Sequence, residues 1–120
     1  MIRKTLVLGL VMLCAGVVFA ASKSQKYTGS IIDNACAAKH SGDAAAIDAH
    51  PVSCALMPPC VKAGYALYSD GKLYKLDASG NKKVEALLKK APTDQKGFKV
   101  DVEGTVSGDT IKVKTITPAT

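Results

Sequence analysis

The sequence predicts a small, mainly β protein: a five-stranded barrel with one helix and with a helical Cys/His insert between strands 1 and 2. Residues 98–103 and 111–114 alternate between apolar and polar side chains, and residues 65–76 form two β-rich runs around a tight turn. Residues 79–90 carry an amphipathic helical pattern between the third strand and the fourth. Residues 34–64, the insert, hold both histidines and three of the four cysteines.

Residues 1–20 are predicted to be a secretory signal peptide. They begin with positive charges, continue with an uncharged and mostly apolar stretch, and end in small residues that suit cleavage after Ala20. The apolar stretch is shorter than the roughly 20 residues that a spanning helix needs. Cys14 lies inside this leader and is expected to be lost with it. The mature chain, residues 21–120, is therefore expected to be a single periplasmic or extracellular domain without a membrane span.

The mature chain has the size and charge of one mildly basic domain. Removal of the leader leaves 100 residues, near the common domain size. It also takes two of the 16 basic residues, which leaves 14 against ten acidic ones, a net charge of +4. The lysines are spread along the chain, so we expect no nucleic acid partner. A core of this size is modest, and a disulfide or a metal would help to stabilise it.

The first strands are predicted from residue type and turn chemistry. Residues 27–33 form strand 1, which leads directly into the insert. The dipeptide Asp70-Gly71 is a strong signal for a two-residue hairpin turn, so that strands 2 and 3 pair around it. In that register Leu67 faces Tyr74 on one side of the hairpin.

The helix and the last hairpin complete the order. Ser79 or Asn81 is expected to cap the helix, which ends in lysines that suit its dipole. Gly104 and the turn at residues 107–109 connect the last two strands. The apolar stripe of the helix consists of Val84, Leu87 and Leu88. The residues of the last two strands that should be buried are Phe98, Val100, Val102, Ile111 and Val113.

Five strands with a helix between the third and the fourth is the element order of an OB-fold barrel. An open five-stranded sheet with the helix on one face is the alternative. In OB-folds the connection between strands 1 and 2 is one of the loops that contact ligands, so an unknown ligand is expected at the mouth of the barrel. The fold alone assigns no function.

The stretch "GSIIDNAC" has the pattern G-x-[IV]-x-D-x-x-C, and a histidine, two cysteines and the hairpin "VEGTVSGDTIKV" follow it. In these positions the chain resembles small secreted bacterial proteins of an OB-fold-like family whose domain has no known function. The matching residues are Gly29, Asp33, Cys36, His40, Cys54, Cys60, Tyr74 and residues 104–113. The resemblance covers nearly the whole mature chain. It implies the architecture and the Cys/His cluster, and no activity.

The insert is expected to contain two short helices and a final turn. Asn34 should cap the first helix, in which Cys36 and His40 lie one helical turn apart. His50 and Cys54 have the same spacing around a second helix. Two prolines then end the second helix, and the third cysteine comes from the next turn.

One interpretation of the cluster is a metal site. Thiolate and imidazole ligands together suit tetrahedral Zn²⁺, for which three cysteines and one histidine are an established set. Cys36, His40, Cys54 and Cys60 would supply it, with His50 as a substitute for His40. Three thiolates would also suit Cu(I), which is a soft ion.

A disulfide is the second interpretation, because exported proteins commonly carry one. The mature cysteines, Cys36, Cys54 and Cys60, allow one bridge and leave one thiol over. A bridge from Cys36 would tether more of the insert than a bridge between the other two. Either a bridge or a bound ion would order a segment that has little apolar content besides alanine.

The third interpretation is a thiol-reactive or redox protein that uses Cys36 with His40 as a thiolate–imidazole pair. No C-x-x-C motif accompanies them, and no oxyanion hole is recognisable. The acidic residues of this region, Asp33, Asp43 and Asp48, do not have the spacing of a calcium loop and are expected to cap helices and solvate turns.

Overall fold

The five predicted strands close into a barrel, as expected. The structure is a computed structural model that describes residues 23–40 and 42–119, so the predicted leader lies outside the described residues. The strands are β1 (Gln25–Asp33), β2 (Tyr65–Ser69), β3 (Lys72–Leu76), β4 (Lys99–Ser107) and β5 (Thr110–Pro118). They are hydrogen-bonded in the order β1-β2-β3-β5-β4, and β4 pairs with β1 to close the barrel. This closure excludes the open-sheet alternative.

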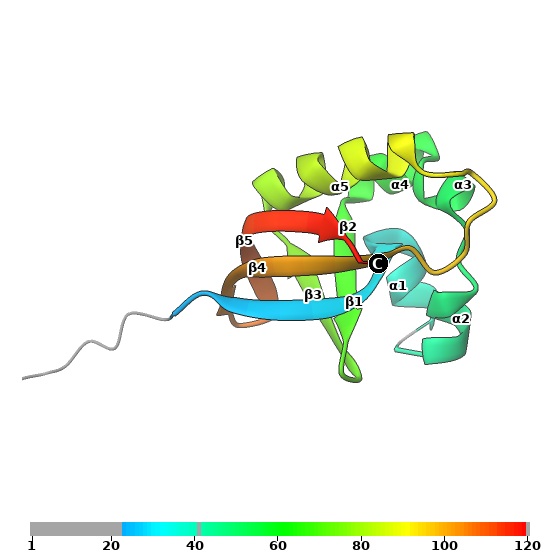
Figure 1. The fold of residues 1–120 in the computed structure, drawn as a ribbon. Helices are drawn as coiled ribbons and strands as arrows, with labels where there is room; N and C mark the ends of the chain where they lie inside the picture. Colours follow the sequence, from blue (N-terminus) through cyan, green and yellow to red (C-terminus); the bar gives the residue numbers. More distant parts are fainter. Residues whose placement is uncertain (1–22, 41, 120) are drawn as a thin grey trace, which may run out of the picture.

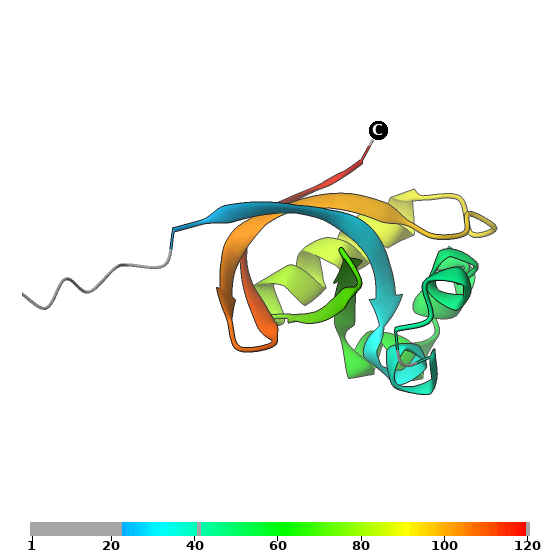
Figure 2. The ribbon, with the colours of Figure 1, turned by 90° about the horizontal axis from the view of Figure 1, so that it is seen from below.

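The topology is that of an OB-like barrel. Every neighbouring pair of strands is antiparallel except β3 and β5, which are parallel. The helix α5 (Ala78–Lys90) makes the connection between β3 and β4 and covers one side of the barrel (Figure 1). Seen from below, β1 and β4 run side by side as a curved arc, with α5 on its concave side (Figure 2).

The β2–β3 hairpin has the predicted turn and register. Asp70 and Gly71 both adopt positive φ angles, 49° and 76°, as a two-residue turn of the mirror-image type requires. Leu67 pairs with Tyr74, and Tyr68 pairs with Leu73 on the other face. The dipeptide therefore fixes which side chains of this hairpin face the core.

The last two strands are longer than the alternating runs suggested, because β4 continues through Gly104. The register of the β4–β5 pair shifts between Glu103 and Gly104. A Cβ at Gly104 would collide with the carbonyl oxygen of Lys112, so only glycine allows the strands to approach here. The turn at residues 107–109 lies where it was predicted, with Gly108 at φ 62°.

The cap of α5 was predicted wrongly. Asp77, rather than Ser79 or Asn81, precedes the helix, and its side chain accepts a hydrogen bond from the Gly80 amide at 2.9 Å. The amide oxygen of Asn81 instead accepts from the Tyr65 amide at the start of β2. The helix begins one residue earlier because an aspartate directly after β3 is already positioned to cap it.

The barrel interior is a single hydrophobic core. Val52 and Ala55 of the insert join it, so protein side chains fill this end of the barrel. Tyr74 and Leu87 are partly buried against the same cluster. The buried residues that come from the strands and from α5 are Ile31, Tyr65, Leu67, Leu76, Val84, Leu88, Val100, Val102, Ile111 and Val113, together with Phe98 before β4. The predicted core positions are confirmed.

The insert contains four short helices instead of the expected two. They are α1 (Asn34–His40), α2 (Ala44–Asp48), α3 (Val52–Ala55) and α4 (Pro58–Ala63), and they gather at one end of the barrel (Figure 1). The alanine-rich α2 is capped by Asp43, which accepts from two backbone amides, and this aspartate has its expected role. The two prolines begin α4 rather than end α3, because proline suits the first turn of a helix.

A second, smaller cluster joins the insert to the outside of the barrel. Ile32 of β1 and Ala66 of β2 point away from the barrel core and are buried against Ala37 of α1 and Ile47 of α2. Tyr68 and Leu73, on the outer face of the hairpin, pack against the same cluster. The insert is thus fixed to the barrel on two sides.

Among the described residues, no helix is long and apolar enough to cross a membrane.

The fold predicts different outcomes for two neighbouring residues of β4. Val100 is completely buried and Lys99 is exposed. Val100→Ala should lower the free energy of unfolding by about 2 kcal/mol, the scale for removing buried methyl groups. Lys99→Ala should change it by less than about 0.5 kcal/mol. Urea denaturation of both variants measures this, and equal effects would contradict the strand register.

Candidate metal centre

The centre of the site is Asp33, the last residue of β1. Its side chain is completely buried at the junction of the barrel and the insert. One carboxylate oxygen, Oδ2, accepts a hydrogen bond from the amide of Cys36 at 2.9 Å, which caps the first turn of α1. Asp33 therefore caps a helix, as was expected of it, and it does so at α1, where Asn34 was predicted to be the cap.

Asn34 has a different task, which is to join α1 to the end of α4. Its backbone amide donates to the carbonyl of Gly64 and its side-chain amide donates to the carbonyl of Ala63, both at 2.9 Å. Because these bonds fix the two helices against each other, the thiols of Cys36 on α1 and Cys60 on α4 come to the same place.

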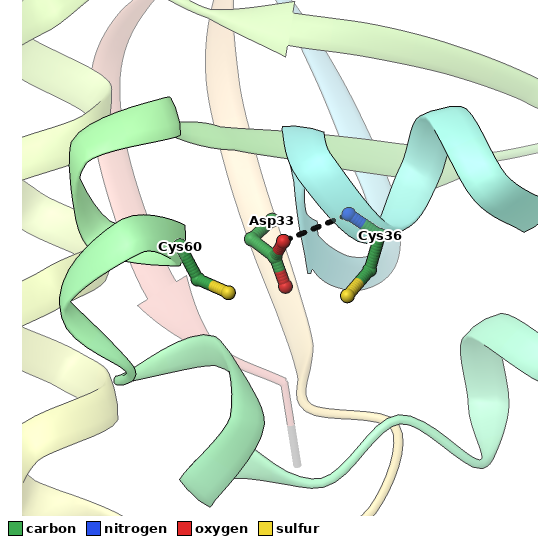
Figure 3. A group of neighbouring side chains, drawn as sticks. All are labelled: Asp33, Cys36 and Cys60. Atoms are coloured by element: carbon green, nitrogen blue, oxygen red, sulfur yellow. Dashed lines mark hydrogen bonds between the residues drawn. The ribbon is translucent and has the colours of Figure 1, made fainter.

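Asp33, Cys36 and Cys60 form a compact group. One carboxylate oxygen and the two Sγ atoms lie within 4.8 Å of one another. The two cysteines reach Asp33 from different helices, with the carboxylate between them (Figure 3). Cys60 is 9% exposed and Cys36 is partly exposed, so the group is closed to solvent on most sides.

His50 stands next to this group. It is 8% exposed, and its Nε2 lies 3.1 Å from the second carboxylate oxygen of Asp33, Oδ1. Despite this distance neither atom has a hydrogen-bond partner, so the pair is close without being aligned as a hydrogen bond. Within the described part of the chain, these are the two buried side-chain nitrogen or oxygen atoms that lack a partner.

The backbone around His50 is held by the connection between α5 and β4. The His50 carbonyl accepts from the Gly97 amide at 3.1 Å, and the Val52 amide donates to the Gln95 carbonyl at 2.9 Å. Gly97 has a φ of 60°, and a Cβ there would stand 2.7 Å from the carbonyl oxygen of Asp48. This close packing fixes the position of His50 relative to β1.

The electrostatics of the site oppose charged thiols. Burial, followed by the charge of Asp33, raises the pKa of Cys36 from 9.0 to about 11. The same two causes raise the pKa of Cys60. Burial lowers the pKa of His50, although Asp33 acts in the opposite direction. At neutral pH the two thiols are protonated and the imidazole is largely neutral.

The structure brings together some of the predicted ligands. Cys36 and Cys60 lie in the same group with Asp33, and His50 is outside this group but contacts Asp33. His40 and Cys54 are not part of the group. His40 acts on the site only from a distance, because its charge lowers the pKa of His50. All three described cysteines are free thiols, so none of the candidate disulfides is present in the structure.

Sequence reasoning did not name Asp33 as a candidate ligand. The signal was present in the D-x-x-C spacing of "DNAC", which allows one aspartate to cap a helix and to reach a cysteine in its first turn. The sequence does not reveal that Asp33 is buried, and an exposed aspartate at this position would only cap the helix. No family model, curated protein or solved structure matches the chain.

The raised pKa of Cys36 predicts slow alkylation of the folded, metal-free protein. A rise from 9.0 to about 11 lowers the thiolate fraction near pH 8 by about 100-fold, since each pKa unit is a factor of ten. Iodoacetamide labelling with peptide mapping should therefore modify Cys36 about 100-fold more slowly in the folded protein than in urea. Labelling of Cys36 at the same rate in both states would contradict the burial of this thiol.

The same shift gives the sign of a pH effect on stability. A thiol whose pKa is higher in the folded protein stabilises it fully below pH 9 and loses this contribution as the pH rises towards 11. The Tm of the reduced, metal-free protein should fall across this window. The Tm of the Cys36→Ser variant should fall less steeply with pH than the Tm of the unmodified chain.

Proposed function

We propose that this protein is an exported domain that binds one zinc ion through Asp33, Cys36, His50 and Cys60. The observation that carries the proposal is the pair of buried, unpartnered atoms, Asp33 Oδ1 and His50 Nε2, which lie 3.1 Å apart. The same aspartate forms a compact group with the thiols of Cys36 and Cys60. A buried polar atom without a partner is costly and rare in folded proteins. A cation between these atoms would satisfy both of them at once.

The charges around the site favour the binding of a cation. A fully buried carboxylate lies against two thiols whose ionisation it opposes. A divalent ion would reverse this opposition, because it attracts the carboxylate and lowers the pKa of coordinating thiols until they deprotonate. The imidazole would bind as the neutral form, which burial already favours.

The donor atoms favour zinc over copper(I). Two thiolates, one imidazole and one carboxylate suit tetrahedral Zn²⁺, whereas Cu(I) prefers sulfur ligands alone. Oxygen and nitrogen ligands lie about 2.0–2.2 Å from zinc, which puts two such atoms about 3.3–3.6 Å apart across a tetrahedral angle. The 3.1 Å between Asp33 Oδ1 and His50 Nε2 is close to this separation.

We infer a structural rather than a catalytic ion. Four protein ligands complete a tetrahedral site, whereas catalytic zinc sites keep one position for water or substrate. The ligands come from the end of β1, from α1, from the connection between α2 and α3, and from α4. One ion would therefore join every part of the insert to the barrel. A further ligand at the mouth of the barrel stays a prediction.

The thiol-reactive alternative has less support. A nucleophilic cysteine needs a lowered pKa, and that of Cys36 is raised by its burial and by Asp33. Lys39 is the group that acts to lower it, and His40 does not contribute. A thiolate–imidazole pair of Cys36 and His40 is therefore the weaker hypothesis.

Zinc binding is tested by titration of the mature, reduced chain. We expect one ion per chain, and zinc at 100 times its Kd should stabilise the protein by about 2.7 kcal/mol. Asp33→Asn keeps a capping oxygen but removes the charge, and should weaken binding at least tenfold, as should His50→Ala. Cys60→Ser should weaken it most, because it removes a thiolate.

Two variants serve as matched controls. Cys54→Ser and His40→Ala alter the same insert without touching the proposed ligands, so both should bind zinc as the unmodified chain does. Circular dichroism establishes that each variant keeps its fold. The proposed ligand set would be overturned if either control variant lost as much zinc affinity as Cys60→Ser does.

Export is a separate part of the proposal, and the positive and apolar segments of residues 1–20 support it. The mature chain should begin at Ala21. Intact-mass measurement of the protein from its native host tests this, and a mass that includes residues 1–20 would refute it.

A further inference from the structure

The two thiols of the site have a second chemical capability. Cys36 and Cys60 have their Sγ atoms within 4.8 Å of each other, and they come from helices that pack together. A disulfide needs the sulfur atoms to approach to about 2.05 Å. Both cysteine side chains would therefore have to rotate towards each other past the carboxylate of Asp33, which lies between them (Figure 3). Cys54 is not a member of the group, although its charge contributes to the raised pKa of Cys60, so Cys36 and Cys60 are the pair that the group brings together.

We propose that oxidation joins Cys36 and Cys60 in a disulfide and thereby releases the ion, so that the insert is held either by metal or by a covalent bond. This inference rests on the proposed zinc site, because it concerns the regulation of the same ligands. The two states exclude each other, since a sulfur in a disulfide is no longer a thiolate ligand.

The oxidant is a small-molecule disulfide, for which oxidised glutathione is the probe. Cys36 is the more exposed of the pair, so the small fraction of Cys36 that is deprotonated attacks one sulfur of the probe and expels the first thiol. Cys60 then attacks the Cys36 sulfur of the mixed disulfide and expels the second thiol. The two cysteines lose two electrons, the probe gains them, and each departing thiolate takes up one proton.

The bond would keep the insert in place after the ion has left. It closes a loop over residues 36–60, which contains α2, α3 and His50. Asn34 and Asp33 would still tie α1 to the rest of the site through their hydrogen bonds. The barrel and its core contribute no cysteine among the described residues and should be the same in both states.

The test uses the reduced mature chain, with and without one equivalent of zinc, exposed to oxidised glutathione. Thiol titration, metal analysis and peptide mapping follow the reaction. The metal-free chain should lose two of its three thiols and yield a Cys36–Cys60 peptide, about two mass units lighter. The zinc-loaded chain should react at least tenfold more slowly and release its ion in step with the same bond. Dithiothreitol should restore both thiols and one bound zinc.

Controls separate this inference from the zinc proposal. Cys54→Ser should form the same bond and release zinc in the same way, whereas Cys36→Ser should form none. A Cys36–Cys60 bond in a chain that binds no zinc would refute the switch together with the zinc site. Zinc binding by the four ligands followed by oxidation to a bond with Cys54, or by no bond, would refute the switch and leave the zinc site standing.

Discussion

A buried carboxylate at the end of a strand is the constraint on which the rest of the insert depends. Asp33 is paired with Tyr65 in the β1–β2 ladder, so its position is fixed by the barrel. From there it caps α1, lies against His50, and raises the pKa of the thiols of Cys36 and Cys60. A charge in such a place needs compensation, and a bound cation is the compensation that we propose.

The barrel and the insert are not independent parts. Val52 of α3 is buried in the barrel core, and Ile32 of β1 is buried under α1 and α2. The hydroxyl of Tyr65, the first residue of β2, donates to the carbonyl of Ala55 at 2.8 Å, and the connection from α5 to β4 bonds to the backbone around His50. The site is therefore built on rigid surroundings, which is what a binding centre with fixed geometry requires.

Local signals were enough to predict the barrel. The Asp70-Gly71 turn sets the register of one hairpin, and strict alternation around Val100 and Val102 sets the buried face of β4. These features depend on residues close in sequence, so period and turn chemistry capture them. Gly104 was predicted to lie between the last two strands, whereas it lies inside β4 at a bulge, which depends on the facing strand.

The site could not be predicted in the same way. The i, i+4 spacing suggested that His50 and Cys54 share a helix, but Pro51 precedes α3 and leaves His50 outside it. The meeting of Cys36 with Cys60 depends on the packing of α1 against α4, a contact between residues far apart in sequence. The local sequence around each cysteine does not show whether Cys36 meets Cys60 or Cys54.

X-ray absorption spectroscopy of the zinc-loaded, reduced protein tests the central claim most directly, because it reports the atoms around the ion. The account predicts two sulfur ligands at about 2.3 Å and two nitrogen or oxygen ligands at about 2.0–2.2 Å. Three sulfur ligands would mean that Cys54 joins the site and that Asp33 or His50 does not. A shell of nitrogen and oxygen alone would mean that the ion binds elsewhere and that the buried carboxylate is compensated in another way.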